Sequence, residues 1–332
     1  MAPRDEIVVG LAYPAAWDRR PPGTIARDVG ALKAVDRRVV VAHCSLDRPR
    51  PGPPAIGVDR LDVAVALTVP PDVTRIAPRL RWVQSLGADV GSLMSRDLAG
   101  AGIRVTSASG VNAVAVAEFA FARVLAHFKR LDELALQQRA HRWIPRHGTQ
   151  LAGRTLGILG LGAIGTELAR RARAFGMHVT AVRRHTGMRS PDVDRLFRPA
   201  DLHAMLAECH AVVACLPDTA ETVDVMDTAA FAAMRPGAFF CNVGRGTAVV
   251  EEGLVAALRA GHLGGAAIDV TRDEPLAADS PLWDVQGLAV SPHCATAADV
   301  HFEGLYGLLR ENLTRFLDGR PLINEVDPVL GY

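Results

Sequence analysis

The sequence lacks a long apolar segment, and it lacks an excess of charge of either sign. Hydrophobic residues make up 49% of the 332 residues, yet no run of them is long and apolar enough to span a bilayer. Lys and Arg together number 37 against 36 Asp and Glu, so the formal net charge is only +1. A nearly neutral protein has no general field that attracts polyanions. We therefore expect a soluble globular protein that binds neither nucleic acid nor a membrane.

Cysteine is also scarce. The five cysteines are odd in number and form no C-x-x-C pair, which argues against a disulfide framework or a cysteine metal site; they are Cys44, Cys209, Cys215, Cys241 and Cys294. We expect them to be reduced, and we expect no bound metal. The N-terminal segment, Met1–Trp17, lacks the basic region and the long apolar core of a signal peptide, which predicts a cytoplasmic protein.

The order of apolar runs predicts the fold class. The chain is longer than one core usually supports, so two domains are expected. Short apolar runs alternate with longer helical patterns, as in βαβ units. They form two series, first Ile7–Leu11, Val39–Ala42, Val63–Val69 and Trp82–Leu86, then Thr155–Leu159, His178–Val182, Ala211–Cys215, Ala238–Val243, Gly265–Val270 and Leu288–Ser291. We expect an α/β protein with two Rossmann-like, doubly wound parallel-sheet domains.

Two helical segments suggest how these domains are connected. A long amphipathic stretch, Val111–Arg130, separates the two series, and a last helix, Asp299–Asp318, has no strand after it. If this last helix packs on the first series, the smaller domain is discontinuous and the larger domain is inserted into it.

A glycine-rich turn follows the first apolar run of the second series. Its residues are Gly160, Leu161, Gly162, Ala163, Ile164 and Gly165, and it opens a helical pattern over Thr166–Phe175. In this context the first glycine makes a tight turn, the second lets the backbone approach a pyrophosphate, and the third lets helix and strand pack closely. The motif predicts a dinucleotide site.

Arginines replace the usual acidic residue at the end of the next apolar run. An NAD-binding fold commonly carries Asp or Glu there for the ribose 2′-hydroxyl, whereas this chain has Arg183 and Arg184. A guanidinium binds a 2′-phosphate through charge-assisted hydrogen bonds. The pair predicts NADP(H) rather than NAD(H), with two solvated surface arginines as the alternative.

Three ionisable residues stand at or after the ends of other runs in this series: Arg245, Glu274 and His293. Ligands of open α/β sheets bind outside the carboxyl ends of the strands, so we expect these side chains to converge. Reduction of a 2-oxo acid needs a cation for the carboxylate and carbonyl, which Arg245 supplies, and an acid for the oxygen, which His293 supplies. Glu274, if bonded to the imidazole, would favour its charged form. Each residue alone also has a purely structural interpretation.

Several longer segments resemble the D-isomer-specific 2-hydroxyacid dehydrogenases. They are LAGRTLGILGLGAIGTELARRARAFGM, LPDTAETVDVMD, MRPGAFFCNVGRGTAVVEEGLVAALRAGHLGGAAIDV, DEPLAADSPLW and SPHCAT. The resemblance implies an NAD(P)-binding Rossmann domain at 107–293, inserted into a substrate-binding domain at 1–106 and 294–332. It also implies a homodimer formed through the nicotinamide domains.

The resemblance assigns roles to individual residues. It makes Arg245, Glu274 and His293 catalytic and puts Asp269 near the nicotinamide carboxamide. Further cofactor contacts are implied for Cys215, Leu216, Pro217, Val243 and Gly244. A loop at Leu86, Gly87, Ala88 and Asp89 would bind the substrate carboxylate through backbone N–H groups.

This carboxylate loop departs from the family pattern. Asp89 replaces the usual second glycine, and Gly91 replaces the usual aspartate. A carboxylate so near an anion site would repel a substrate acid. Either Asp89 points away, or the substrate carries a group that needs an acceptor.

The resemblance is strongest to the glyoxylate and hydroxypyruvate reductase branch, because of the arginine at the ribose position. We therefore expect an NADPH-preferring reductase of a small 2-oxo acid. One alternative is a non-catalytic dinucleotide sensor like the corepressors of this fold. The other is a formate- or phosphite-oxidising relative, although the formate type has glutamine before its histidine, where this chain has Ser291, Pro292 and His293.

Overall fold

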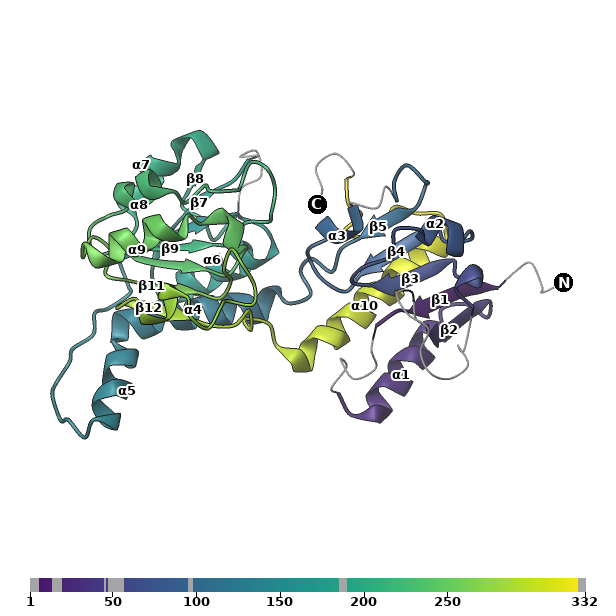
Figure 1. Cartoon of the computed structure of the whole chain (residues 1–332), viewed down its shortest axis with the longest axis horizontal. Coiled ribbons are helices and arrows are strands. Elements are labelled where there is room, and N and C mark those ends of the chain that lie inside the picture. Colours follow the sequence, from purple (N-terminus) through teal and green to yellow (C-terminus); the bar gives the residue numbers. More distant parts are fainter. Residues whose placement is uncertain are drawn as a thin grey trace. The chain divides into compact units, whose positions relative to one another are not determined.

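The computed structural model describes residues 6–13, 20–44, 46, 57–94, 98–184 and 190–327, which form two compact units (Figure 1). Unit 1 consists of Met1–Asn112 and Ala298–Tyr332, and unit 2 of Ala113–Ala297. Part of the N-terminal segment that bears on the signal-peptide expectation, residues 1–5 and 14–19, lies outside the described residues. The assignment of substrate to 1–106 with 294–332, and of dinucleotide to 107–293, stays a prediction.

Unit 1 is built on a five-stranded parallel sheet in the order β2-β1-β3-β4-β5. Its strands are β1 (Ile7–Leu11), β2 (Val39–His43), β3 (Val63–Ala66), β4 (Trp82–Ser85) and β5 (Arg104–Thr106). Its helices are α1 (Pro22–Lys33), α2 (Val73–Ile76), α3 (Gly91–Met94) and α10 (Ala298–Leu317), with the 3₁₀ turn η2 (Val58–Arg60). The buried face of α10 packs with strand residues in one core, where Trp82 is fully buried.

Unit 2 is built on a seven-stranded parallel sheet in the order β12-β11-β10-β9-β6-β7-β8. Its strands are β6 (Thr155–Leu159), β7 (His178–Val182), β8 (Arg195–Phe197), β9 (Ala211–Ala214), β10 (Phe239–Asn242), β11 (Gly265–Ile268) and β12 (Leu288–Val290). Its helices are α4 (Ala113–Lys129), α5 (Leu131–Arg139), α6 (Ala163–Ala174), α7 (Leu202–Glu208), α8 (Thr228–Ala233) and α9 (Glu251–Arg259), with η3 (Pro199–Asp201), η4 (Gly246–Ala248) and η5 (Pro281–Asp284).

Helices cover both faces of the unit 2 sheet. One core lies between the sheet and α4 with α6, and the other lies between the sheet and α7, α8 and α9. Strands buried on both faces need continuous apolar runs rather than alternation. This requirement explains why short apolar runs in the sequence identified the central strands, and the predicted α/β class with two parallel sheets is confirmed.

Two strands and one helix boundary were missed by the sequence pattern. β5 and β8 have three residues each, begin with arginine and lie at sheet edges, so they carry little apolar signal. The amphipathic stretch expected at Val111–Arg130 is α4, and a separate helix α5 follows it after Arg130, whose φ is 56°. α5 projects away from the rest of unit 2 in Figure 1, and none of its residues is buried.

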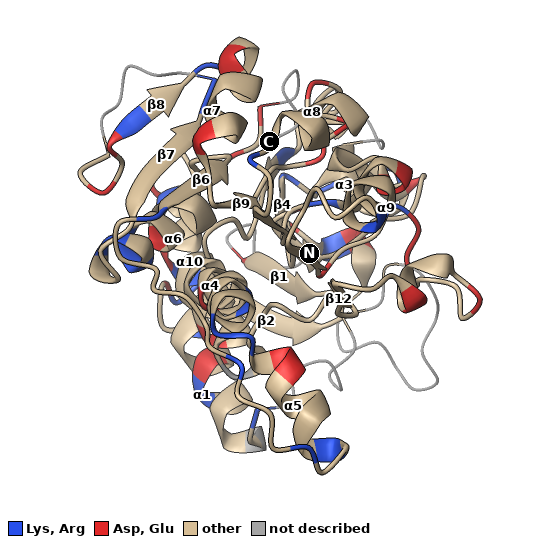
Figure 2. Ribbon diagram, turned by 90° about the vertical axis from the view of Figure 1, so that its left-hand side faces the viewer, with Lys and Arg blue, Asp and Glu red and all other residues tan. Residues whose placement is uncertain are grey.

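Acidic and basic residues are interspersed over the ribbon in Figure 2. Many form ion pairs, as Arg171 does with Glu167 at 2.6 Å and with Glu118 at 2.9 Å. In the part of the chain that the structure describes, no helix has both the length and the apolar character needed to cross a membrane.

Candidate active site

The glycine-rich turn connects β6 to α6, and each of its glycines has a different reason to be glycine. Gly160 has a φ of 94°, which side chains rarely adopt. A Cβ on Gly165 would lie 2.2 Å from the Gly160 carbonyl oxygen, so the helix can approach the strand only without a side chain there. A Cβ on Gly162 would meet nothing within 4 Å. Packing therefore does not require Gly162, which is consistent with a place where backbone N–H groups approach a ligand.

The carboxyl ends of β6, β9 and β10 lie against one another. A Cβ on Gly160 would lie 3.0 Å from the Cys215 carbonyl oxygen, and a Cβ on Gly244 would lie 2.7 Å from the Leu216 backbone. β6 and β9 are the neighbours at which the strand order reverses, the usual place for a dinucleotide in such sheets. Burial raises the pKa of Cys215 to about 12, so this thiol is a neutral part of the wall.

The two arginines after β7 have different surroundings. The Arg184 guanidinium forms an ion pair with Glu221, which follows β9. The half-buried side chain of Arg183 makes no ion pair or hydrogen bond with any of the described residues. Arg183 is therefore better placed than Arg184 to bind a phosphate.

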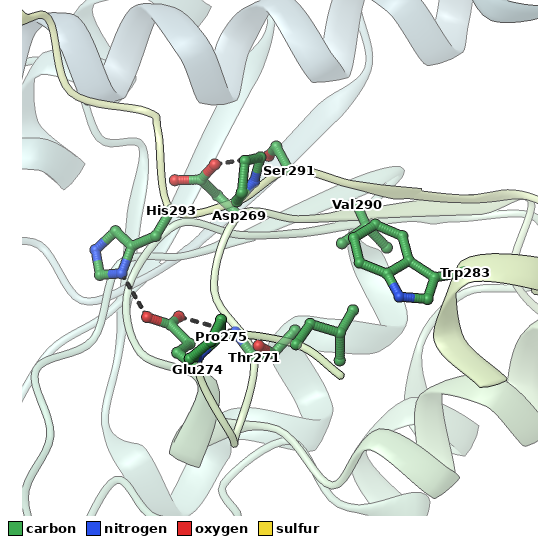
Figure 3. A pocket seen from close by; sticks show the side chains of 10 residues that line it. Asp269, Thr271, Glu274, Pro275, Trp283, Val290, Ser291 and His293 are labelled. Atoms are coloured by element: carbon green, nitrogen blue, oxygen red, sulfur yellow. Dashed lines mark hydrogen bonds and ion pairs between the residues drawn. The ribbon is translucent and has the colours of Figure 1, made fainter. Parts of the chain in front are cut away.

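His293 and Glu274 form a hydrogen-bonded pair (Figure 3). Nδ1 of His293 lies 2.8 Å from Oε2 of Glu274. The other carboxylate oxygen, Oε1, accepts the backbone N–H of Thr271 at 3.1 Å. The imidazole is 51% exposed, and among the described residues Nε2 has no hydrogen-bond partner. One nitrogen is thus oriented by the protein while the other faces outward.

Asp269 holds the loop that carries this imidazole. His293 has a φ of 49°, in the left-handed region, and its N–H donates to the Asp269 carbonyl at 2.8 Å. The Asp269 carboxylate is almost fully buried and accepts the Ser291 hydroxyl at 2.6 Å and the N–H groups of Cys294 and Ala295 at 3.0 and 2.9 Å. These bonds fix the backbone on both sides of His293.

Cys294 follows His293 directly and is exposed. Desolvation and the nearby Asp269 carboxylate raise the pKa of its thiol. A thiol with a raised pKa is a poor nucleophile, because the thiolate is the reactive form. Cys294 therefore does not compete with His293 for a chemical role.

Arg245 follows β10 on a turn that Asn242 makes rigid. The buried Asn242 amide donates to the Arg245 carbonyl at 2.9 Å, and its oxygen accepts the Gly244 N–H at 3.0 Å. The half-buried Arg245 side chain donates from Nη1 to the Gly244 carbonyl at 2.7 Å. Sequence reasoning missed Asn242, although a polar residue at the end of the apolar run AFFCN was an available signal.

A cavity of about 380 Å³ adjoins the His293–Glu274 pair within unit 2. Figure 3 shows the pair at one end of it and Trp283 with Val290 at the other. Its walls are Asp269, Thr271, Glu274, Pro275, Leu276, Trp283, Val290, Ser291, Pro292 and His293. A few polar groups facing an apolar wall are typical of sites for small organic molecules.

The expected carboxylate loop follows β4 in unit 1. Gly87 donates its N–H to the Ser85 hydroxyl at 3.1 Å, and the carboxylate of Asp89 accepts the Gly91 N–H at 2.8 Å. Asp89 is thus bonded to the backbone of its own loop, and both alternatives for this residue stay predictions. The Ala88 N–H has no acceptor among the described residues, so it is available to an anion.

The structure brings Arg245, Asp269, Glu274 and His293 to the carboxyl ends of β10, β11 and β12, which are consecutive in one sheet. Other predicted cofactor residues follow neighbouring strands of the same sheet: the glycine-rich turn follows β6, Arg183 and Arg184 follow β7, and Cys215, Leu216 and Pro217 follow β9. The loop at 86–89 belongs to unit 1. Sequence reasoning missed the side chain or backbone contacts of Asn242, Thr271 and Arg272.

The chain matches the model of a known protein family over residues 121–295. That model is described as the NAD binding domain of the D-isomer specific 2-hydroxyacid dehydrogenases. The matched segment includes the glycine-rich turn and the residues from Arg245 to His293.

Curated relatives cover most of the chain. A glyoxylate reductase of Korarchaeum cryptofilum is 31% identical over 270 residues, 78% of this chain and 80% of the relative. A glyoxylate/hydroxypyruvate reductase A of Serratia proteamaculans is 31% identical over 290 residues, 83% of this chain and 90% of the relative.

Solved structures match over nearly the full length. A D-isomer specific 2-hydroxyacid dehydrogenase from Xanthobacter autotrophicus, in complex with NADPH and MES, has a TM-score of 0.82 and 30% identity and covers 99% of this chain and 100% of its own. An NADPH-dependent glyoxylate/hydroxypyruvate reductase from Sinorhizobium meliloti, in complex with NADP and sulfate, has a TM-score of 0.80 and 26% identity, with 99% and 100% coverage.

The open space around Gly162 leads to the first prediction. Gly162→Val should leave the melting temperature nearly unchanged, because the new side chain meets no protein atom within reach of its Cβ. It should raise the Kd for NADPH about tenfold or more, equivalent to about 1.4 kcal/mol, because it occupies the space of the pyrophosphate. Isothermal titration calorimetry and thermal unfolding measure the two effects.

Gly165→Val is the matched control, since its Cβ would collide with the Gly160 carbonyl. It should lower the melting temperature as well as weaken NADPH binding. Unchanged NADPH affinity in Gly162→Val would show that the turn does not hold a dinucleotide.

Proposed function

We propose that this chain, which belongs to the D-isomer specific 2-hydroxyacid dehydrogenase family, reduces a small 2-oxo acid to the 2-hydroxy acid with NADPH. Membership makes it an NAD(P)-dependent oxidoreductase of 2-hydroxy acids. The observation that carries the proposal is the 2.8 Å contact between His293 Nδ1 and Glu274, in a sheet whose neighbouring strand end carries Arg245.

His293 is the proton donor of the proposed reaction. Bound NADPH supplies the hydride that C2 of the oxo acid receives. His293, in its charged form, transfers the Nε2 proton to the carbonyl oxygen, which becomes the hydroxyl. The Glu274 carboxylate accepts a hydrogen bond from Nδ1–H, so it fixes the ring orientation and leaves Nε2 to face the substrate. In the reverse direction neutral His293 takes the proton back.

Arg245 is the proposed carboxylate receptor. Its planar guanidinium can bind a carboxylate through two parallel hydrogen bonds, a geometry that lysine lacks. The same positive charge polarises the adjacent carbonyl toward the oxygen that receives the proton. Asn242 keeps the Arg245 backbone in place while the side chain changes partners.

The proposed substrates are glyoxylate, hydroxypyruvate or a larger 2-oxo acid. Two similar proteins carry the names glyoxylate reductase and glyoxylate/hydroxypyruvate reductase A. The Ala88 N–H in unit 1 is the kind of donor that the family resemblance assigns to the substrate carboxylate. Because Asp89 is bonded to Gly91, its carboxylate does not itself require a cationic substrate.

Arg183 supports NADPH over NADH as the cofactor. Among the described residues its side chain makes no ion pair, unlike that of Arg184, and a guanidinium matches a 2′-phosphate. Two of the similar structures hold NADPH or NADP.

A homodimer formed through the nicotinamide domain is the proposed assembly. The projecting segment 131–144 exposes five large apolar side chains, with Trp143 98% exposed; the others are Leu131, Leu134, Leu136 and Ile144. Large apolar side chains exposed in this number on one projecting segment are candidates for an interaction surface. A second copy of this chain is the partner that the family resemblance implies.

The reaction itself is tested with a panel of 2-oxo acids and with His293→Ala. The wild type should oxidise NADPH with at least one member of the panel. His293→Ala should lower kcat by about 10²- to 10⁴-fold, the usual contribution of a general acid, while the Kd for NADPH changes less than about twofold. No wild-type turnover with either cofactor would contradict the enzyme proposal, and near-normal turnover by His293→Ala would reject the proton-donor role.

Cofactor choice is tested with Arg183→Asp. The ratio of kcat/KM for NADPH to that for NADH should fall about tenfold or more, because one charge-assisted contact contributes about 1.5–3 kcal/mol and the new carboxylate repels the phosphate. Arg184→Asp is the control, with a much smaller change expected because Arg184 is paired with Glu221. If the NADPH-to-NADH ratio of kcat/KM is the same in the wild type and in Arg183→Asp, Arg183 is a surface charge with no role in cofactor choice.

Assembly is tested with Trp143→Glu and Leu136→Glu. Light scattering on the wild type should give the mass of two chains, and both variants should shift toward one chain because a buried carboxylate opposes association. Gln138→Glu adds the same charge at an exposed polar position of α5 and should stay dimeric. A monomeric wild type, or variants that remain fully dimeric, would overturn the assignment of this surface.

A further inference from the structure

The turn after β10 and the turn after β11 are in direct backbone contact. A Cβ on Gly246 would lie 1.9 Å from the Thr271 carbonyl oxygen and 2.5 Å from the Arg272 nitrogen. No side chain fits between these two peptides. Gly246 directly follows Arg245, and Thr271 donates its N–H to Glu274. The turn that carries Arg245 and the turn that carries Glu274 therefore meet at one point.

The Arg272 side chain extends from the second turn across the first. Its Nη2 donates to the carbonyl of Val249 at 3.0 Å and to that of Thr247 at 3.4 Å, and it forms an ion pair with Asp224. These carbonyls belong to or directly follow η4, the short helical turn after Arg245. Asp224 is itself joined to the same segment, since its N–H donates to Thr247 at 2.9 Å.

The Arg272 backbone makes a further connection. Its N–H donates at 2.8 Å to Oε1 of Glu251, in the first turn of α9. A single residue thus joins the Glu274 turn to η4, to Asp224 and to the start of α9.

We propose that Arg272 is a positioning residue that sets the spacing between Arg245 and the His293–Glu274 pair. This inference rests on the proposed function. In a 2-oxo acid the carboxylate and the carbonyl are on adjacent carbons, so the groups that bind them have little freedom in separation. A misplacement of about 1 Å at such a site lowers the rate about 100-fold.

The exposure of Arg272 separates this role from a general contribution to stability. The side chains of Arg272 and Asp224 are 39% and 49% exposed. Exposed ion pairs contribute only about 0–1 kcal/mol to folding. Loss of the side chain should therefore shift the two turns without unfolding unit 2.

The experiment compares full-length wild type with Arg272→Met, which keeps the length of the side chain but removes its donors. With NADPH saturating, KM for the best 2-oxo acid should rise about tenfold and kcat/KM should fall about 100-fold. KM for NADPH should stay within about twofold, and the melting temperature within about 4 °C. Arg272→Lys, which can reach one acceptor but not three, should recover part of the loss.

Arg259→Met is the matched control, because Arg259 is an exposed arginine at the end of α9 that makes no ion pair with any described residue. It should behave as wild type. Unchanged substrate KM in Arg272→Met would overturn the positioning role. So would a rise of substrate KM that is accompanied by an equal rise of NADPH KM and a lower melting temperature, since that pattern indicates general destabilisation.

Turnover by the wild type in the same assay tests the proposed function. The ratio of kcat/KM in Arg272→Met to that in the wild type tests the positioning role. Hydrogen–deuterium exchange supplies a readout that needs no turnover. Arg272→Met should accelerate exchange in 246–250 and 271–274 and leave 160–174 unchanged. If both turns exchange at the same rate in Arg272→Met as in the wild type, the inference is overturned, even if the wild type has no activity.

Discussion

The buried carboxylate of Asp269 holds the backbone on both sides of His293, and the position of the imidazole depends on it. A left-handed φ at a residue other than glycine costs about 1–2 kcal/mol. Hydrogen bonds to a charged group contribute about 1.5–3 kcal/mol each, and Asp269 accepts three from Ser291, Cys294 and Ala295. The free energy of these three hydrogen bonds therefore exceeds the cost of the backbone strain at His293. Without it, a buried set of donors would lose its acceptor, and the loop would relax away from Glu274.

The parallel sheet of unit 2 makes such an arrangement possible from residues that are far apart in the chain. Arg245, Asp269 and His293 follow β10, β11 and β12, which are paired in register. Each side chain is set by the strand before it, and the turns are then locked by Asn242, by Gly246 and by Arg272. Few of these groups need to move when a ligand binds, and preorganised dipoles and charges are the main source of electrostatic catalysis.

The sequence predicted the fold class and the residues that end its strands, but not the contacts that position them. Arg245, Glu274 and His293 were visible because each follows an apolar run. β5 and β8 were not, because three residues at a sheet edge carry no periodicity. Asn242, Thr271 and Arg272 act through hydrogen bonds to distant backbone groups, which leave no pattern in the chain. The difference between Arg183 and Arg184 depends on Glu221, 37 residues from Arg184.

In the proposed reaction, His293 Nε2, held outward by Glu274 and Asp269, delivers a proton to the substrate carbonyl. A crystal structure with NADPH and oxamate, a non-reacting isostere of a small 2-oxo acid, tests it most directly. We expect the oxamate carbonyl oxygen about 3 Å from His293 Nε2 and the oxamate carboxylate on the Arg245 guanidinium. Oxamate bound with its carbonyl away from His293, or with its carboxylate away from the Arg245 guanidinium, would contradict this proton transfer.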